Sequence, residues 1–491
     1  MSDLVGDVVG NEVAGPGVEA RSAPPLCVDL DGTLVKSDTL HDSMLVLIRS
    51  HPRKLVMLPT WLTGGKAMFK QHVTSVVSLD VAHLPYNLEL LEYLRAEHAA
   101  GRRIYLATGA DGRLAHRVAE YLGIFNGVLA SDGRTNLTGN HKLTDIEARF
   151  GAFDYIGNAP PDLPLLRRAG SAMVANPDRR LRAQLRSGRV PIERQFNDRR
   201  PTLKVLAKAI RVHQWAKNVL IFLPLLLAHS LQAGPLLRCV LAFACFSACA
   251  SATYIVNDLL DLEADRRHPK KRNRAFASGD LSAAAGVVLA AVLVILAFVG
   301  AHWLSAAFFG WLVVYGITTL AYSLFLKRIA LVDVLVLSGL YTLRLLAGGA
   351  AAPVPISPWL SAFSIFLFLS LAMVKRFSEL HNLREAGATP RNGRGYLLAD
   401  IEQLRSFGTS SAYASVIVFI FYVSGRDVVS LYRHPQRMWL MIPLLIWWLN
   451  RVWLLASRGE LDEDPLIFAL TDRVSLLLGA LMAAVAALAA M

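Results

Sequence analysis

Residues 254–279 read YIVNDLLDLEADRRHPKKRNRAFASG, in which four acidic residues follow an apolar run typical of a membrane helix. At about 100° per residue, an uninterrupted helix places Asp258, Asp261 and Asp265 within an arc of about 60° on one face. They then form an acidic wall about 10 Å long at the end of a span. A carboxylate inside a bilayer costs about 2.5 to 3.5 kcal/mol on insertion scales, so this clustering predicts a compensating cation.

Mg²⁺ is the cation that fits such a wall. It binds through carboxylates and shares oxygens with substrate phosphates, so the motif predicts a site for a diphosphate. The basic run 266–274, with Arg266, Lys270 and Arg274, adds anion-binding donors beside the metal. The alternative is a solvated loop of mixed charge at the membrane surface, which the regular spacing and the adjacent Asn257 disfavour.

The composition places this motif in a membrane protein. Of 491 residues 54% are hydrophobic, and the formal net charge is +13 at pH 7. A chain this apolar and basic indicates cytosolic loops at an anionic lipid face and phosphorylated substrates, and it disfavours nucleic acid as a partner. The four cysteines form no secreted disulfide framework, since three lie in one apolar stretch and one in an expected buried strand.

The distribution of polar and apolar residues predicts four regions. Residues 1–22 lack the pattern of a signal peptide and are expected to be a disordered cytosolic lead. Residues 23–185 alternate short apolar strands with amphipathic stretches, which is typical of a soluble α/β domain. Residues 186–205 form a basic linker, either solvated or lying on the membrane surface, and 206–491 form the apolar part.

The apolar part contains about nine stretches near the bilayer-spanning length, which predicts an all-α membrane bundle. The expected spans are 215–237, 240–260, 283–301, 304–325, 329–351, 359–374, 407–424, 438–456 and 474–491. Basic loops alternate with nearly uncharged ones, although SGRDVVSLYRHPQR breaks the pattern. The positive-inside bias then fits an N-terminal domain in the cytosol, and an odd number of spans across the cell membrane leaves Met491 outside.

The sequence NDLLDLEAD at 257–265 resembles the NDxxDxxxD motif of the UbiA-type intramembrane prenyltransferase superfamily. The resemblance covers about residues 202–491 and implies nine transmembrane helices with a Mg²⁺-diphosphate site open to the cytosol. Further stretches resemble the decaprenylphosphoryl-5-phosphoribose synthase (polyprenyl-phosphate phosphoribosyltransferase) branch, namely VHQWAKNVLIFLPLLLAHS, DRRHPKKRNRAFASG, LKRIALVDVLVLSGLYTLRLLAGG and DEDPLIFALTDRVS. This branch implies transfer of 5-phosphoribose from phosphoribosyl pyrophosphate to a polyprenyl phosphate.

One departure from the superfamily bears on the donor. Where prenyl-diphosphate enzymes typically carry a second DxxxD motif, this chain reads MVKRFSEL, with Lys375, Arg376 and Glu379. Fixed positive charge suits a further phosphate without a second metal, which fits the 5-phosphate of phosphoribosyl pyrophosphate. The alternative is a plain helix-end ion pair between Lys375 and Glu379, four residues apart.

Four more polar residues are candidates for the same site. Arg344 is an intramembrane charge, for which Asp333 or a lipid phosphate is an expected partner. Lys217 and Asn218 begin the first span and are expected at its mouth, although a snorkelling lysine explains Lys217 equally well. Lys327 lies in a cytosolic loop and completes the expected substrate-binding set.

The charges predict a mechanism. With Mg²⁺ at Asp258, Asp261 and Asp265, pyrophosphate departs, the anomeric carbon gains oxocarbenium character and an anionic lipid phosphate attacks without a strong general base. The runner-up is prenylation of an aromatic acceptor, and a transporter would leave the acidic repeat unexplained. The bilayer and both substrates are the expected partners, and a homo-oligomeric state stays open.

The soluble region has its own motif, PLCVDLDGTLVKSD at 25–38. Asp29 and Asp31 follow an apolar strand and lie on the same side of the chain by alternation. A nucleophilic carboxylate beside a carboxyl that acts as acid and base can cleave a phosphate ester. The DxDGT pattern resembles the first motif of haloacid dehalogenase-type phosphatases, which implies a Rossmann-type sheet and a small helical cap at 38–84.

This second resemblance implies further site residues. Thr108 is similar to the second motif and Lys142 to the third, where a lysine orients the nucleophile and the phosphate. Asn158 stands where the family usually has a metal-binding aspartate, with Asp162 four residues later, so Asn158 and the two aspartates of the first motif are the expected Mg²⁺ site. The missing charge leaves two hypotheses open. The domain either removes the 5-phosphate of the transferase product or is a non-catalytic binding module.

Overall fold

The structure is a computed structural model that describes residues 23–491 except 230–231, 386, 388–393 and 462–463. The expected lead, residues 1–22, lies outside the described residues. The chain divides into two units. The first runs to Arg200 and includes Arg266–Pro269 and Ser278–Asp280, and the second holds the remaining residues.

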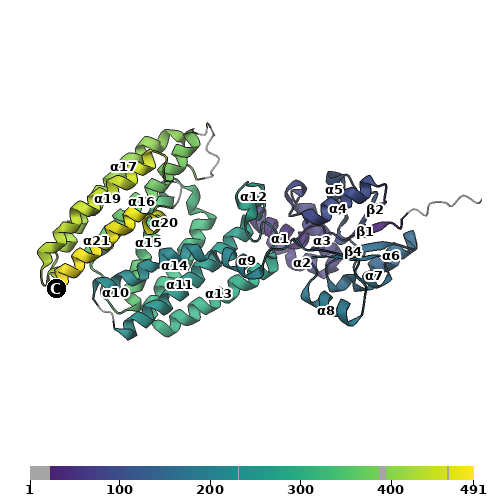
Figure 1. The fold of residues 1–491 in the computed structure, drawn as a ribbon, viewed down its shortest axis with the longest axis horizontal. Helices are drawn as coiled ribbons and strands as arrows, with labels where there is room; N and C mark the ends of the chain where they lie inside the picture. Colours follow the sequence, from purple (N-terminus) through teal and green to yellow (C-terminus); the bar gives the residue numbers. More distant parts are fainter. Residues whose placement is uncertain (1–22, 230–231, 386, 388–393, 462–463) are drawn as a thin grey trace, which may run out of the picture. The chain divides into compact units, whose positions relative to one another are not determined.

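The first unit is built on a six-stranded parallel sheet with strand order β3-β2-β1-β4-β5-β6 (Figure 1). Its strands are β1 (Leu26–Val28), β2 (Ile104–Asp111), β3 (Gly127–Ser131), β4 (Asp154–Gly157), β5 (Ala172–Ala175) and β6 (Arg194–Phe196). The predicted α/β fold is confirmed, and β6 extends the sheet into the range expected to be a linker. Parallel strands bring their carboxyl ends to one edge, where Asp29 follows β1, Thr108 lies in β2 and Asn158 follows β4.

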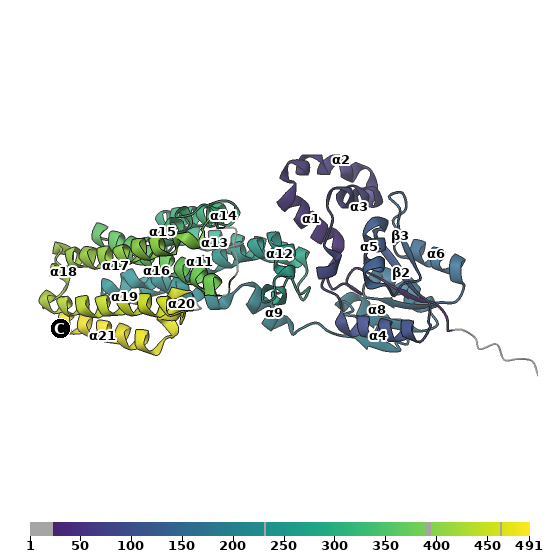
Figure 2. The same ribbon diagram turned by 90° about the horizontal axis from the view of Figure 1, so that it is seen from above.

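The helices of the first unit cover both faces of this sheet and also form a cap. They are α1 (Thr39–Ser50), η1 (Pro52–Met57), α2 (Leu58–Thr63), α3 (Gly65–Val76), η2 (Val81–His83), α4 (Leu88–Ala99), α5 (Gly112–Leu122), α6 (Asn140–Phe150), η3 (Pro160–Asp162), α7 (Leu163–Arg168) and α8 (Arg179–Ser187), where η is a 3-10 helix. Leu26 and Val28 pack with α4 and α5, and Cys27 packs with α6, α7 and α8. The segment from α1 to α3 lies between β1 and β2 in the sequence and forms the expected helical cap (Figure 2).

The second unit is an all-α bundle. Its helices are α9 (Thr202–Ala209), η4 (Val212–Phe222), α10 (Leu223–Leu227), α11 (Ala233–Leu260), α12 (Leu262–Arg267), η5 (Lys271–Asn273), α13 (Ala283–Leu304), α14 (Ala306–Leu324), η6 (Leu326–Arg328), α15 (Val332–Ala351), α16 (Pro358–Glu385), η7 (Leu398–Asp400), α17 (Ile401–Val423), α18 (Arg426–Leu431), η8 (Pro435–Leu440), α19 (Met441–Ser457), α20 (Pro465–Thr471) and α21 (Arg473–Ala490). The last two residues of α12 group with the first unit. Among the described residues, eight helical segments are long and apolar enough to cross a membrane. The predicted membrane bundle is thereby confirmed.

The first expected span, 215–237, differs from the structure. Val212–Leu227 is a shorter apolar helical segment, and α11 starts only at Ala233. Pro224 lies in the shorter segment, and Pro235 lies in the first turn of α11, where a missing N–H group is tolerated. The sequence is apolar in both Val212–Leu227 and the start of α11, so hydropathy alone predicted a single span, 215–237, that includes parts of both.

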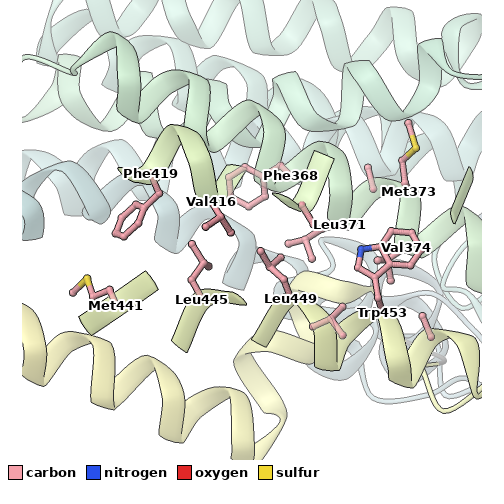
Figure 3. Close-up of a cluster of buried hydrophobic side chains, with 14 of the residues drawn as sticks. Phe368, Leu371, Met373, Val374, Val416, Phe419, Met441, Leu445, Leu449 and Trp453 are labelled. Atoms are coloured by element: carbon pink, nitrogen blue, oxygen red, sulfur yellow. The ribbon is translucent and has the colours of Figure 1, made fainter. Parts of the chain in front are cut away.

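The largest buried cluster of the second unit joins α16, α17 and α19 (Figure 3). The ring of Trp453 fills the space that Gly408 leaves open, since a Cβ atom there would lie 2.2 Å from the ring. The indole Nε1 donates to Ser370 Oγ at 3.1 Å, so the buried N–H group is satisfied. Phe368 and Leu371 extend from this core to a cavity. The four cysteines of the chain are buried and form no disulfide bond.

Candidate functional site

The acidic motif lies where α11 ends. α11 stops at Leu260, Asp261 takes the C-cap position with φ −94° and ψ 12°, and α12 begins at Leu262. The uninterrupted helix face expected for Asp258, Asp261 and Asp265 is therefore broken at its middle residue. The change in backbone direction gives Asp261 a different basic partner from the other two aspartates.

Arg274 joins the two outer aspartates. Its Nη1 atom lies 3.1 Å from Asp258 Oδ1 and 2.6 Å from Asp265 Oδ2. Arg211 adds a second guanidinium to Asp258, and it lies over the ring of Tyr254 at 4.8 Å from the centroid. Both aspartates are buried, and burial raises the pKa of Asp265 although Arg274 opposes the rise.

Asp261 faces Lys327 instead. The Lys327 Nζ atom lies 3.6 Å from Asp261 Oδ2 and 3.5 Å from Asn257 Oδ1. In the described part of the chain, no three His, Cys, Asp or Glu side chains converge as a metal-binding group. The donor set still fits Mg²⁺, because the motif supplies carboxylate and amide oxygens, and the cations now paired with them are phosphate ligands in their own right.

A cavity of about 300 Å³ opens beside this motif. Seven basic side chains and one carboxylate, that of Asp261, line it among the described residues. The basic residues are Arg211, Lys217, Lys271, Arg274, Lys327, Arg344 and Arg394. Arg211, Arg274 and Lys327 are paired with the aspartates of the motif, but the basic side chains still outnumber the carboxylates around the cavity, which favours an anionic ligand with phosphate groups.

Arg344 reaches this cavity from α15, and its hydrogen-bond acceptors are neutral. Nε donates to Asn218 Oδ1 at 2.9 Å, and Nη2 donates to the Tyr315 hydroxyl at 3.1 Å. Nη1 donates to the Leu340 carbonyl at 2.5 Å. Asp333, which the sequence offered as a partner, pairs with a different arginine. The positive charge of Arg344 is therefore oriented without being neutralised by that carboxylate.

A second cavity of about 310 Å³ adjoins the first, since Lys217 lines both. Lys217 Nζ and Lys375 Nζ lie 2.7 and 2.8 Å from the same oxygen, Asp464 Oδ2. Burial would raise the pKa of Asp464, but Lys375 and Lys217 outweigh it and hold the pKa well below its usual range. The sequence analysis did not select Asp464. Its one local signal is the Asp-Pro pair that starts α20.

Arg376 also lines the second cavity, yet its guanidinium is bound inside the bundle. Nε lies 2.6 Å from Asp333 Oδ2, and Nη1 lies 2.6 Å from Glu379 Oε2. Asp333 is fully buried and also accepts from the Tyr396 hydroxyl. Glu379 thus pairs with Arg376, three residues before it, and Lys375 pairs with Asp464.

Six residues expected at this site are not among those that line the two cavities, namely Asn218, Asp258, Asp265, Arg266, Lys270 and Glu379. The first three and Glu379 contact residues that do line them, but Arg266 and Lys270 are placed differently. Arg266 groups with the first unit, where its Nη2 atom lies 2.8 Å from Asp42 Oδ2 and 3.1 Å from Ser37 Oγ. Lys270 is exposed and precedes η5. The structure therefore brings neither residue to the described cavity walls, although both follow the motif closely in sequence.

Comparison with known proteins identifies the family. The sequence profile of the UbiA prenyltransferase family matches residues 218–477, which include the acidic motif. This chain belongs to the UbiA prenyltransferase family. A protein of Sinorhizobium fredii (strain NBRC 101917 / NGR234), named "Uncharacterized protein y4nM", is 37% identical over 465 residues, which is 94% of this chain and 90% of that protein.

The chain is also similar to an enzyme of known name and to a solved structure. The decaprenyl-phosphate phosphoribosyltransferase of Mycobacterium tuberculosis (strain CDC 1551 / Oshkosh) is 36% identical over 283 residues, covering 56% of this chain and 90% of that protein. A solved UbiA homolog from Archaeoglobus fulgidus bound to DMAPP and Mg²⁺ has a TM-score of 0.45 and 16% identity, covering 58% of this chain and 98% of that chain.

In this UbiA family member, the first unit holds a separate polar cluster at the carboxyl edge of its sheet. Lys142 Nζ lies 2.8 Å from Asp29 Oδ1 and 3.0 Å from the Tyr155 hydroxyl. The Tyr155 hydroxyl donates to Asp162 Oδ1 at 2.7 Å, and Lys142 Nζ lies 3.6 Å from the same oxygen. The structure thus brings together the candidates for the first and third phosphatase motifs.

Asn158 lies against the backbone of the first motif. A Cβ atom at Gly32 would lie 2.1 Å from Asn158 Nδ2, and Gly32 has φ +76°, so only glycine fits. Thr33 Oγ1 donates to Asn158 Oδ1 at 3.2 Å. Asp162 Oδ2 accepts from the backbone N–H groups of Asn158 and Ala159 at 3.0 and 3.2 Å. Both carboxylate oxygens of Asp162 therefore accept hydrogen bonds from its own domain and orient the loop that carries Asn158.

The two aspartates of the first motif have different environments. Burial raises the pKa of Asp29 to about 6, although the charge of Lys142 opposes it. Burial and the nearby charge of Asp38 raise the pKa of Asp31 to about 7. Asp31 Oδ1 also accepts the Thr39 N–H group at 2.8 Å, at the start of the cap. Lys142 therefore stabilises the ionised form of Asp29, whereas no cation in the described part of the chain forms an ion pair with Asp31, which suits a nucleophile and a proton donor.

A cap lysine lies close to Thr108, a residue of β2. Thr108 is fully buried, and its hydroxyl accepts the Ala110 N–H group at 3.0 Å. Lys70 from α3 donates to the Gly109 carbonyl at 2.6 Å, next to Thr108. Burial lowers the pKa of Lys70. The sequence analysis missed Lys70, because only the fold of the cap brings it to the second motif.

Proposed function

We propose that the second unit transfers 5-phosphoribose from phosphoribosyl pyrophosphate to a polyprenyl phosphate, and that the first unit removes the 5-phosphate from the product. The observation that carries the proposal is the cavity beside the acidic motif, lined by seven basic side chains and one carboxylate among the described residues. A prenyl diphosphate brings one diphosphate, whereas the ribosyl donor brings a 5-phosphate as well. The name of the Mycobacterium tuberculosis relative supports these substrates.

In this proposal Asp258, Asp261 and Asp265 hold Mg²⁺, which when bound neutralises negative charge on the diphosphate. Arg274 and Lys327, which pair with these aspartates in the structure, bind the diphosphate oxygens. The bond between ribose C1 and the pyrophosphate oxygen breaks, and its electron pair leaves on pyrophosphate. An oxygen of the lipid phosphate forms the new bond to C1, and this phosphate is already anionic, so no strong general base is required.

The second cavity is the proposed site for the 5-phosphate of the donor. Lys217 and Lys375 share one oxygen of Asp464, so both ammonium groups are held together and each keeps further N–H donors for a phosphate. Arg376 was expected to read the same phosphate. Its contacts to Asp333 and Glu379 instead support a positioning role for the helix that carries Lys375.

For the first unit we propose phosphate ester hydrolysis at Asp29. The Asp29 carboxylate attacks phosphorus, and Asp31 protonates the leaving ribose oxygen. Asp31 then takes a proton from the water that cleaves the acyl phosphate and restores Asp29. Lys142 holds Asp29 at 2.8 Å. Thr108 is the proposed phosphate ligand. Asp29, Asp31 and the Asn158 amide oxygen would hold Mg²⁺, which would neutralise charge on the phosphate, with one carboxylate fewer than the phosphatase resemblance implies.

The test incubates full-length protein in nanodiscs with Mg²⁺, phosphoribosyl pyrophosphate and a polyprenyl phosphate, and measures the mass of the lipid. Wild-type protein should yield polyprenylphosphoryl ribose, and Asp29→Asn should accumulate the 5-phosphorylated lipid at an unchanged transfer rate. Asp258→Asn should abolish most transfer with the fold retained. Full activity in EDTA, or prenylation of an aromatic acid without use of the ribosyl donor, would contradict the proposal.

A further inference from the structure

The cap of the first unit carries exposed apolar side chains. The exposed fraction is 82% for Val56, 60% for Leu62, 49% for Met57 and 40% for Met68. These residues lie on η1, α2 and α3, and α2 lies at the tip of the cap, away from the strands of the same unit (Figure 2). Trp61, from α2, packs into the buried core below. The cap is therefore amphipathic, with one packed side and one uncovered apolar side.

The same segment is basic throughout. The sequence between residues 43 and 79 contains no Asp or Glu. It contains Arg49, Arg53, Lys54, Lys66 and Lys70. The side chains of Arg53, Lys54 and Lys66 are exposed and lie next to the apolar residues in the sequence. Large apolar side chains bordered by Lys and Arg are typical of surfaces that lie in the headgroup layer of an anionic bilayer.

We propose that this cap surface, made of Val56, Met57, Leu62, Met68 and their basic neighbours, docks onto the anionic face of a lipid bilayer. A bilayer is within reach because the same chain continues into eight helical segments long enough to cross one. A second copy of the chain is a poorer occupant, since two such surfaces would bring like charges together. The inference goes beyond the proposed function and does not depend on catalysis by the first unit.

Docking at this surface would affect how substrates reach the first unit. α3 carries Met68 on the exposed surface and, two residues later, Lys70, whose ammonium donates to the Gly109 carbonyl beside Thr108. One short helix thus connects the proposed lipid contact with the candidate phosphate site. A phosphate ester that is anchored in the bilayer by a lipid chain is the substrate class that this arrangement suits.

The test uses full-length protein in lipid nanodiscs, with an environment-sensitive fluorophore attached to Leu62→Cys. The four native cysteines are buried, so labelling is directed to the new thiol. Leu88→Cys is the matched control, because Leu88 is 67% exposed and begins α4 of the same unit. With anionic lipid present, spin-labelled lipids should quench the probe at position 62 on the order of twofold or more and leave position 88 nearly unquenched.

A charge variant tests the basic residues. Replacing Arg53, Lys54 and Lys66 together with glutamate should abolish the quenching at position 62 without changing the melting temperature of the labelled protein. Equal, weak quenching at positions 62 and 88 would overturn the proposal. A blue shift at position 62 that needs no lipid and grows with protein concentration would also overturn it, because a second copy would then cover the surface. No turnover is measured, so this result is separate from any failure of the proposed function.

Discussion

Replacing Arg376 with leucine is expected to destabilise the second unit strongly. The change leaves fully buried Asp333 without the guanidinium that lies 2.6 Å from it. Removing one partner of a buried ion pair costs about 3 to 5 kcal/mol, because the remaining charge is uncompensated. Glu379 also loses a partner, but its side chain is 34% exposed, so this loss adds less than about 1 kcal/mol. The free energy of unfolding should therefore fall by about 3 to 5 kcal/mol.

The assay is thermal unfolding of detergent-purified protein, followed by tryptophan fluorescence. A loss of this size lowers the melting temperature by roughly 5 to 8 °C, because a unit of about 280 residues has an unfolding entropy of about 0.6 kcal/mol/K. Lys375→Leu is the matched control, because the neighbouring ammonium is 32% exposed and Asp464 keeps Lys217 as a partner. Its stability cost should stay below about 1 kcal/mol, while its KM for phosphoribosyl pyrophosphate rises.

The double variant Arg376→Leu with Asp333→Leu should recover most of the lost stability, because both buried charges are then removed. The reasoning is refuted if Arg376→Leu melts together with the wild-type protein and only its KM for the donor rises. That result would assign Arg376 to the donor phosphate, as its place in the sequence suggests.

Asp464→Asn should raise the KM for the ribosyl donor on the order of tenfold or more in steady-state assays, because the charge that holds two cavity lysines together is lost. The phosphatase rate should follow a bell-shaped pH profile with limbs near the pKa values of about 6 for Asp29 and about 7 for Asp31, since the nucleophile must be ionised and the proton donor protonated. With an aryl phosphate, whose leaving group needs no proton, the limb on the alkaline side should disappear. Asn158→Asp should lower the Mg²⁺ concentration for half-maximal phosphatase rate on the order of tenfold in a metal titration, and an unchanged value would exclude residue 158 as a ligand.

The α/β fold of the first unit and the helical bundle of the second were predictable, because both are indicated by patterns of apolar residues within short stretches of sequence. A short apolar strand followed by polar residues predicted β1 and the position of Asp29. Long apolar runs predicted most of the membrane-length helices. The first span was misplaced because hydropathy does not show where a helix starts, such as the start of α11 at Ala233 with Pro235 in its first turn.

The site was less predictable because its contacts join distant parts of the chain. Lys375 and Arg376 are adjacent, but consecutive helix residues point about 100° apart, so the sequence cannot decide which of them serves the cavity. Asp464 meets Lys375 from another helix, 89 residues away. No periodicity links such residues, and only the packing of the bundle brings them together.

The charge balance of the second unit bears on the choice between the proposed acceptors. The three aspartates of the acidic motif are paired with Arg211, Arg274 and Lys327, so this part of the site is nearly neutral. Arg344 is different, because its hydrogen bonds go to neutral oxygens that orient the guanidinium without cancelling its charge. A magnesium diphosphate would satisfy the motif, yet Arg344 would still face the cavity as a cation at membrane depth. Because the 5-phosphate is assigned to Lys217 and Lys375, the phosphate of the lipid acceptor is the group that would supply this charge, whereas a neutral phenolic acceptor would not.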